Sequence, residues 1–381
     1  MLAIAGVFAC AHSAQRATKL TQLEQAQSYI RNGEPQRALP LFAQLERASP
    51  DSLEIARLKA EAYVRAGRAA ELTAELESHP KPRAATHYML ALLFAASAHP
   101  GHGAADACAQ LEAAIALRPL EPELHYRLGL VLLLLKRQEQ ALGPLRRATE
   151  LDGKSTAPFL PLAKALHQIG KRAEALTALA EWALRRPPEA ELTAAKSVMD
   201  EIAPPFAGMP TSAQPLFLKA AVLLEEDDPV GAIALFEQLA RDHPQAAIVH
   251  AMLALCFRRL DDAGRAIDEL RQAIALVPSD GRSHQYLGEV YLERRQLAQA
   301  KSEFARAIEL NPLLEQAHLA LAQLAMQESD LPGARRHLTI AGSLDPHNPT
   351  VALQLTALNL RVLPHAAPVE EREQSRAEAV R

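Results

Sequence analysis

Residues 281–312 read GRSHQYLGEVYLERRQLAQAKSEFARAIELNP, and this stretch decides the fold. Large apolar residues recur at spacings of three and four, first before Gln296 and again after it. That period puts them on one side of a helix, so the stretch predicts two amphipathic helices joined by a short turn. The small residues Gly288 and Ala300 allow the two helices to approach closely, and Pro312 ends the second helix.

The hairpin pattern returns every 34 residues. Prolines mark the period at Pro244, Pro278, Pro312 and Pro346. The neighbouring units repeat the same order of residues: His250, Leu253, Ala254, Phe257, Ala266, Leu270 and Ala273, then His318, Leu321, Ala322, Ala325, Ala334, Leu338 and Ala341. Residues 19–52, 122–155 and 156–189 fit the same frame. Because one hairpin cannot bury its apolar face alone, the period predicts a stack of hairpins.

These residues resemble the tetratricopeptide repeat family, whose 34-residue unit carries small residues at positions 8, 20 and 27 and proline at position 32. The resemblance implies an all-α fold, a right-handed superhelical solenoid of about nine stacked helical hairpins with a capping helix.

The period also predicts how the chain is divided. Two units are irregular: residues 53–83 are short, and residues 84–121 carry extra residues around 99–103. Residues 204–210 hold three prolines and a glycine and cannot continue a helix. The predicted parts are a signal segment (1–14), an array of about five repeats (19–189), an irregular joint (190–212), an array of four repeats (213–348), a capping helix (349–363) and a disordered charged tail (364–381).

Composition excludes several classes of partner. The net charge of −4 over 381 residues gives no electrostatic reason to bind nucleic acid. The longest apolar candidate, residues 128–135, is far shorter than the ~20 residues that span a bilayer, so we expect no transmembrane segment. Cys10, Cys108 and Cys256 lie too far apart for a metal-knuckle spacing, and three cysteines cannot all pair, so the sequence indicates no disulfide framework. Cys108 and Cys256 are expected to be buried thiols.

No catalytic motif stands in the sequence. A Walker A loop, a Rossmann fingerprint, a nucleophile elbow, an HExxH pair and paired CxxC are all missing, and the repeats leave no room for a separate catalytic domain. We therefore expect no enzymatic activity and no cofactor.

Histidines recur at position 4 of five units: His87, His125, His250, His284 and His318. Equivalent helices of successive repeats lie about 9–10 Å apart, whereas each ligand of a shared zinc ion lies about 2.1 Å from the metal. We therefore interpret the row as packing between helices and expect no metal site.

The amino terminus favours export. An apolar run over residues 2–9 meets the small residues around Cys10, which resembles the end of a secretory signal or a bacterial lipobox with a lipid anchor at Cys10. The run is short and no basic residue precedes it, so a disordered start or a helix topping the fold is the alternative. Abundant Ala and Leu, with more Arg than Lys, are typical of a GC-rich bacterial genome.

By resemblance, first-helix positions 2, 5, 6, 9, 12 and 13 line a groove that binds a protein or peptide partner. In the units at 84 and 122 this groove is apolar: Tyr88, Met89, Leu92, Tyr126, Leu130, Leu133 and Leu134. We expect it to meet a partner, the joint helix or a second copy of the chain, unless neighbouring repeats cover it. In the second array the groove is polar: Arg258, Arg259, Arg282, Gln285, Tyr286, Glu289 and Gln323.

The sequence therefore predicts a non-enzymatic scaffold that binds a protein partner in bacterial envelope assembly or secretion, as a periplasmic protein or outer-membrane lipoprotein. Two alternatives stay open. One is a regulatory or substrate-recruiting subunit of an envelope polysaccharide or transfer enzyme, and the other is a cytoplasmic adaptor.

Overall fold

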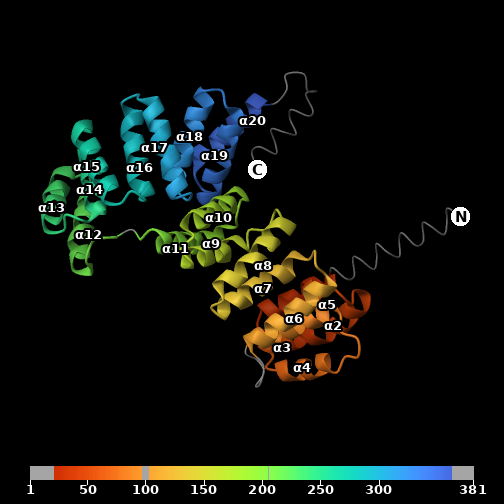
Figure 1. Ribbon diagram of the computed structural model, residues 1–381. Coiled ribbons are helices and arrows are strands. Elements are labelled where there is room, and N and C mark those ends of the chain that lie inside the picture. The colour runs from red at the N-terminus through yellow and green to blue at the C-terminus, as the bar shows by residue number, and fades with distance from the viewer. Residues whose placement is uncertain (1–20, 97–102, 205, 363–381) are drawn as a thin grey trace. The chain divides into compact units, whose positions relative to one another are not determined.

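The computed structural model describes residues 21–96, 103–204 and 206–362 (Figure 1). Every regular element in these ranges is a helix, as the apolar period predicts. The chain divides into two compact units, residues 1–169 and residues 170–381, which are described separately below. The stretch predicted as a joint, residues 190–212, falls inside the second unit.

The first unit begins with a helical stretch over residues 21–31. Its further helices are α2 (Pro35–Ala48), α3 (Leu53–Arg65), α4 (Ala69–Glu77), α5 (Ala84–Ala95), α6 (Ala104–Leu117), α7 (Pro122–Leu134), α8 (Gln138–Leu151) and α9 (Phe159–Gln168).

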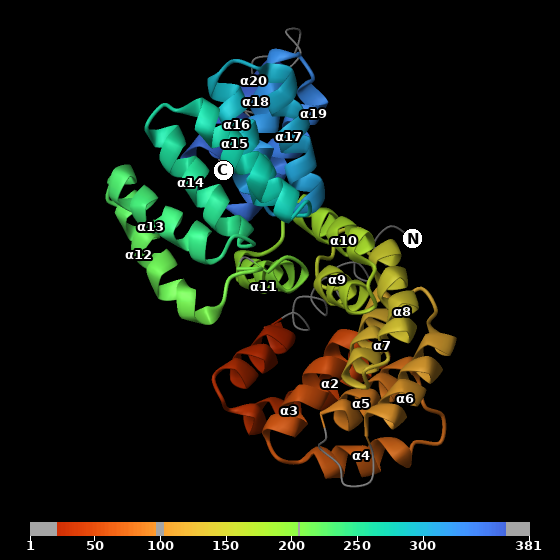
Figure 2. The same cartoon turned by 60° about the vertical axis from the view of Figure 1, so that its left-hand side comes forward.

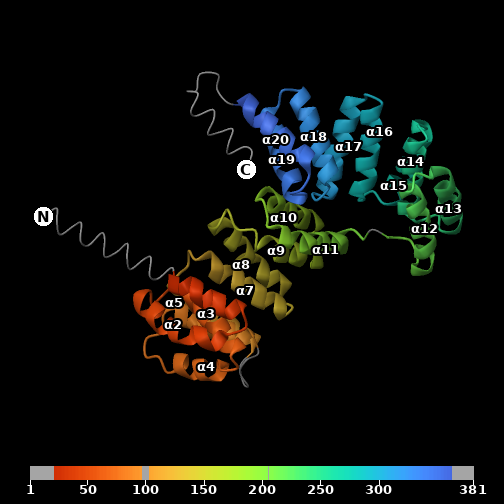
Figure 3. The same cartoon turned by 180° about the vertical axis from the view of Figure 1, so that it is seen from behind.

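The second unit holds α10 (Arg172–Leu184), η1 (Glu189–Glu191), α11 (Leu192–Ile202), η2 (Thr211–Ala213), α12 (Gln214–Glu225), α13 (Pro229–Asp242), α14 (Ala247–Arg259), α15 (Ala263–Leu276), α16 (Gly281–Glu293), α17 (Leu297–Leu310), α18 (Glu315–Gln327), α19 (Leu331–Leu344) and α20 (Pro349–Val362). Helices α14 to α20 stand side by side in chain order in opposite views (Figures 1 and 3).

Consecutive helices form hairpins, and neighbouring hairpins pack on each other from α2 to α8 in the first unit and from α12 to α20 in the second. The tightest pairs are α5 with α6, α7 with α8, α14 with α15, α16 with α17 and α18 with α19. Between hairpins, α6 packs on α7, α13 on α14, α15 on α16 and α17 on α18. The apolar stripes of the second unit merge into a continuous core from Met209 to Leu324. The fold is an all-α solenoid of stacked hairpins.

Small residues stand where paired helices cross, as predicted. A Cβ atom on Gly129 of α7 would lie 2.5 Å from the side chain of Leu145 in α8, and one on Gly288 of α16 would lie 2.9 Å from the ring of Phe304 in α17. Real Cβ atoms do not come this close to a neighbour. The two glycines therefore set the helix separation in these hairpins.

A left-handed residue follows the first helix of eight hairpins; the turn between α5 and α6 lies partly outside the described residues. The residues with positive φ in these turns are Gly33, Gly67, Lys136, Gly170, Asp227, Asp261, Arg295 and Ser329. The last four recur every 34 residues, whereas 57 residues separate Gly170 from Asp227. The residue after the turn donates its N–H back into the helix, as Gln296 does to the Tyr291 carbonyl at 2.9 Å.

The short unit of residues 53–83 departs from the standard hairpin. Its second helix, α4, has nine residues, and α3 packs directly on α5. The buried Lys59 ammonium lies 3.0 Å from the Glu46 carboxylate and 3.3 Å from that of Glu75. These ion pairs tie α2, α3 and α4 together.

Candidate partner-binding surfaces

Helix α7 is apolar on two faces, and the repeat covers one of them. Leu124, Leu128, Val131 and Leu132 are buried. On the other face Tyr126, Leu130 and Leu133 are half-buried, and Leu134 is 63% exposed. We call Tyr126, Leu130, Leu133 and Leu134 the α7 surface.

The predicted groove residues on α5 are less accessible. Tyr88 is fully buried, Met89 is 5% exposed and Leu92 is half-buried. The Tyr88 hydroxyl donates to the Glu123 carboxylate of α7 at 2.7 Å, and burial, together with this carboxylate, raises the pKa of the phenol. Tyr88 and Met89 thus lie inside the first unit, so the accessible part of the predicted apolar groove is the α7 surface.

Three residues of the predicted polar groove come together on α14 and α16. The Glu289 carboxylate accepts hydrogen bonds from Arg258 and, at 2.8 Å, from Gln285. The Arg258 guanidinium also lies 3.8 Å from the Glu293 carboxylate. Their charges and donors are matched within the unit, so these groups have little to gain from a partner.

The other four predicted residues are dispersed. Arg259 pairs with Asp227 at 2.9 Å, and Gln323 is half-buried on α18. Tyr286 packs against the apolar core, and burial raises the pKa of its phenol. Arg282 is exposed, and its guanidinium forms no ion pair with the residues that the structure describes.

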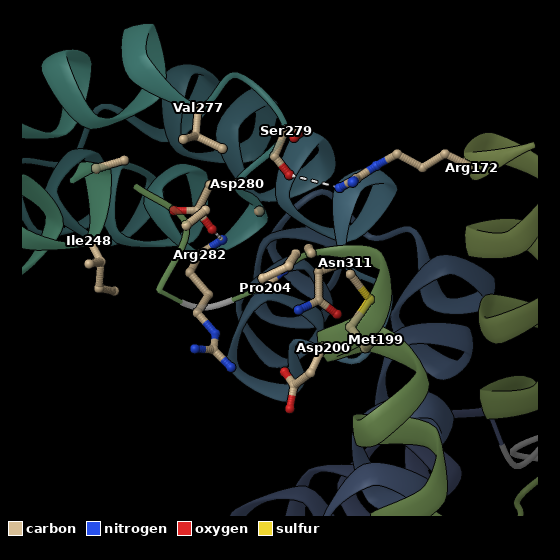
Figure 4. A pocket seen from close by; sticks show the side chains of 14 residues that line it. Arg172, Met199, Asp200, Pro204, Ile248, Val277, Ser279, Asp280, Arg282 and Asn311 are labelled. Carbon is tan, nitrogen blue, oxygen red and sulfur yellow. Dashed lines mark hydrogen bonds between the residues drawn. The ribbon is translucent and has the colours of Figure 1, made fainter. Parts of the chain in front are cut away.

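A cavity of about 170 Å³ opens between α11 and the second array. Helix α11 lies near the turns that precede α14 and α16 (Figure 2). One wall comes from α11 and the segment after it: Met199, Asp200, Ala203, Pro204 and Ala207. The other comes from the repeats: Ala247, Ile248, Val277, Ser279, Asp280, Gly281, Arg282 and Asn311. Figure 4 shows Ile248 and Met199 on opposite sides.

Arg172 of α10 connects the two walls of this cavity. Its guanidinium donates to the Ile202 carbonyl at the end of α11 (2.5 Å) and to the Ser279 carbonyl before α16 (3.3 Å; Figure 4). Both acceptors are neutral, so no carboxylate compensates its charge through these bonds.

Sequence reasoning named Arg282 but missed the cavity and Arg172. Ser279 lies 107 residues from Arg172, and a 34-residue period carries no information about such a contact. The only available signal was the helix-breaking run at 204–210, which requires the chain to leave the repeat pattern there.

The histidine row packs between paired helices. Four of its members contact the second helix of their own hairpin: His87 with Gln110 at 2.7 Å, His250 with Glu269 at 2.8 Å, His284 with Glu303 at 2.7 Å and His318 with His337 at 3.1 Å. Within the described residues, no three metal-ligating side chains gather at one point.

The two described cysteines, Cys108 and Cys256, are buried and unpaired, as expected. Burial raises the pKa of both thiols, that of Cys256 to about 11. At neutral pH both are therefore neutral apolar side chains and weak nucleophiles.

Comparison with known proteins identifies the family. The tetratricopeptide repeat model matches residues 23–71, 101–156, 217–281 and 287–349, more than half of the chain. The chain therefore belongs to the tetratricopeptide repeat family, and the predicted family is confirmed. Its repeats support a role as a protein–protein interaction scaffold.

Among solved structures, the crystal structure of the APC/C hetero-tetramer Cut9-Hcn1 is similar to this chain at 12% identity and a TM-score of 0.35. The match covers 88% of this chain and 55% of that one, so the chain spans about half the length of its match. No curated protein matches the sequence. Of the helices described, none has both the length and the apolar content to cross a bilayer.

Proposed function

We propose that this tetratricopeptide repeat protein captures a protein partner on the α7 surface. The observation that supports it is the exposure of Leu134 beside the half-buried Leu130 and Leu133, on a helix whose opposite face is already packed. Clustered exposed apolar side chains of this kind are typical of interaction sites. The partner supplies an apolar segment, and release of water from both surfaces drives binding.

The test is a pair of charged substitutions. The double variant Leu130→Glu with Leu134→Glu should weaken partner capture at least about 10-fold, because burying two carboxylates against an apolar segment is unfavourable. Capture is measured by quantitative mass spectrometry of material bound to the immobilised chain, and helical content by circular dichroism.

Leu120→Glu is the matched control, since Leu120 is 69% exposed in the turn before α7 and lies outside the α7 surface. A partner that this control retains and the double variant loses supports the proposal. Equal capture by the double variant and the wild type would remove the α7 surface as the site.

We also propose where the protein acts. It is an exported scaffold in bacterial envelope assembly or secretion, and it is either periplasmic or anchored to a membrane through lipid at Cys10. The support is the apolar run and small residues of the first 14 positions, which lie outside the described residues, as does the predicted tail at 364–381. Catalysis is expected to lie on other chains, because no catalytic motif stands in this one.

A further inference from the structure

The cavity beside α11 is large enough to hold one aromatic ring. A cavity of 150 Å³ lined by apolar side chains accommodates benzene, and this one measures about 170 Å³. Met199, Ile248 and Val277 supply apolar surface from three different elements. The interior therefore fits a large apolar side chain.

The charged part of the lining consists of two arginines and two aspartates. Arg172 is half-buried and bonded to two neutral carbonyls, and Arg282 makes no ion pair with a described residue. The Asp280 carboxylate already accepts bonds from the Arg282 and Ser283 amides and from the Ser283 hydroxyl. Asp200 and Arg282 are both exposed, so water screens their charges more strongly than that of Arg172.

Specific contacts fix the walls of the cavity. Arg172 links Ile202 to Ser279, and the ring of Phe206 meets that of Phe217 edge-on at 5.5 Å. Gly208 has a φ of +81°, and a Cβ there would lie 2.5 Å from the Gln245 carbonyl oxygen. The segment that follows α11 is thereby seated against the repeats, so the cavity exists before a ligand arrives.

We propose that this cavity is a second docking site, which takes a large apolar side chain of a protein partner, with a neighbouring carboxylate bound by Arg282. The occupant is an acidic peptide segment that carries a ring. Such a pair suits the lining, because the ring fills the apolar interior and the carboxylate receives charge-assisted hydrogen bonds at the rim. Both this site and the α7 surface would bind protein partners, but the observations that support the one do not depend on the other.

Capped tetrapeptides test the proposal on the full chain. Glycine-phenylalanine-aspartate-glycine should bind with a Kd on the order of 1 mM, which ligand-observed NMR detects. Replacing the aspartate by asparagine, or the phenylalanine by alanine, should weaken binding about 10-fold, since each change removes one of the two recognition elements.

Two variants locate the site. Arg282→Gln should weaken the aspartate peptide about 10-fold and leave the asparagine peptide unchanged, whereas Ala203→Leu, which fills the cavity, should abolish binding of both. Arg241→Gln, at an exposed arginine in the last turn of α13, should change neither. Arg282 is itself exposed, so its replacement tests the site even if Ala203→Leu perturbs α11.

Three results would overturn the proposal: no binding of the aspartate peptide to the wild type, the same affinity for both charge forms, or full binding to both variants. Binding of N-acetylphenylalanine as tight as that of the tetrapeptide would also contradict it, because it would make the ligand a small molecule. None of these results bears on the α7 surface, which the Leu130 and Leu134 variant tests separately.

Discussion

The histidine at position 4 faces different partners in different repeats. His250 and His284 face carboxylates, whereas His318 faces His337, with their Nδ1 atoms 3.1 Å apart. The other ring nitrogen of His318 bonds to the Pro312 carbonyl at 3.1 Å, so it carries the proton. His337 must then donate to His318, and both rings are neutral.

Acid should therefore weaken this repeat. Burial, followed by the neighbouring His337, lowers the pKa of His318 to about 4. Burial and the nearby Arg336 also lower the pKa of His337, and Asp330 acts in the opposite direction. Because the unfolded chain binds these protons more readily, stability is full above about pH 6.5 and falls as pH drops toward 4. We expect a loss of about 2 kcal/mol from His318 between pH 7 and pH 5, measured by urea unfolding.

Exchanging the facing residues provides the control. His337→Glu recreates the pair found in the two preceding repeats and should reduce this acid loss. Glu303→His makes the reciprocal change beside His284 and should increase it. An acid loss that is the same in all three proteins would show that these pairs do not govern it.

At the scale of the helix, Gly129 should tolerate a side chain less well than a glycine at an open position. Gly129→Ala places a methyl group 2.5 Å from the buried Leu145 side chain, and overpacking of this kind costs about 1–3 kcal/mol. The gain in helix propensity offsets about 1 kcal/mol of this cost, so the variant should be destabilised by up to about 2 kcal/mol.

Gly264→Ala, in the first turn of α15, is the control. Gly264 is exposed, and a Cβ there would lie 3.6 Å from Oδ1 of Asp262, an ordinary van der Waals contact. Only the propensity gain, of up to about 1 kcal/mol, should therefore appear. Thermal unfolding should show a lower midpoint for Gly129→Ala and no decrease for Gly264→Ala. A midpoint of Gly129→Ala at or above that of the wild type would mean that the separation of α7 and α8 is not set at Gly129.

The helices could be predicted from sequence far better than the accessible surfaces. Tyr88 and Tyr126 hold the same position 5 in their units, yet Tyr88 is buried and Tyr126 is half-buried. The difference depends on contacts with other repeats, such as the bond from Tyr88 to Glu123. The 34-residue period predicts the features that equivalent residues of different repeats have in common. The accessibility of each residue depends on its particular neighbours, which differ from repeat to repeat.

For the whole chain, the proposed export makes a prediction about location. Wild-type protein should fractionate with membranes, and Cys10→Ala should move to the soluble fraction, because the thiol is the only point of lipid attachment that we propose. The measurement is membrane fractionation, with mass spectrometry of the amino-terminal peptide for cleavage and lipid. An uncleaved cytoplasmic protein would contradict export.

The cavity beside α11 is a feature of the whole chain that the repeat pattern does not predict. It exists because α11 and the residues after it fold back against the array, with Arg172 and Ser279 joined across 107 residues. Such a contact depends on the path of an irregular segment, for which the sequence offers only a negative signal, the inability of residues 204–210 to form a helix.

The left-handed turn residues have an evolutionary consequence. In the second array they lie 34 residues apart, at Asp227, Asp261, Arg295 and Ser329. A duplication or deletion whose ends fall on two of them adds or removes one complete hairpin, and every remaining helix keeps a neighbour of the same kind. Gene rearrangement can therefore lengthen or shorten the array without refolding it, while the peptide cavity beside α11 depends on the hairpins that begin at Ala247 and Gly281.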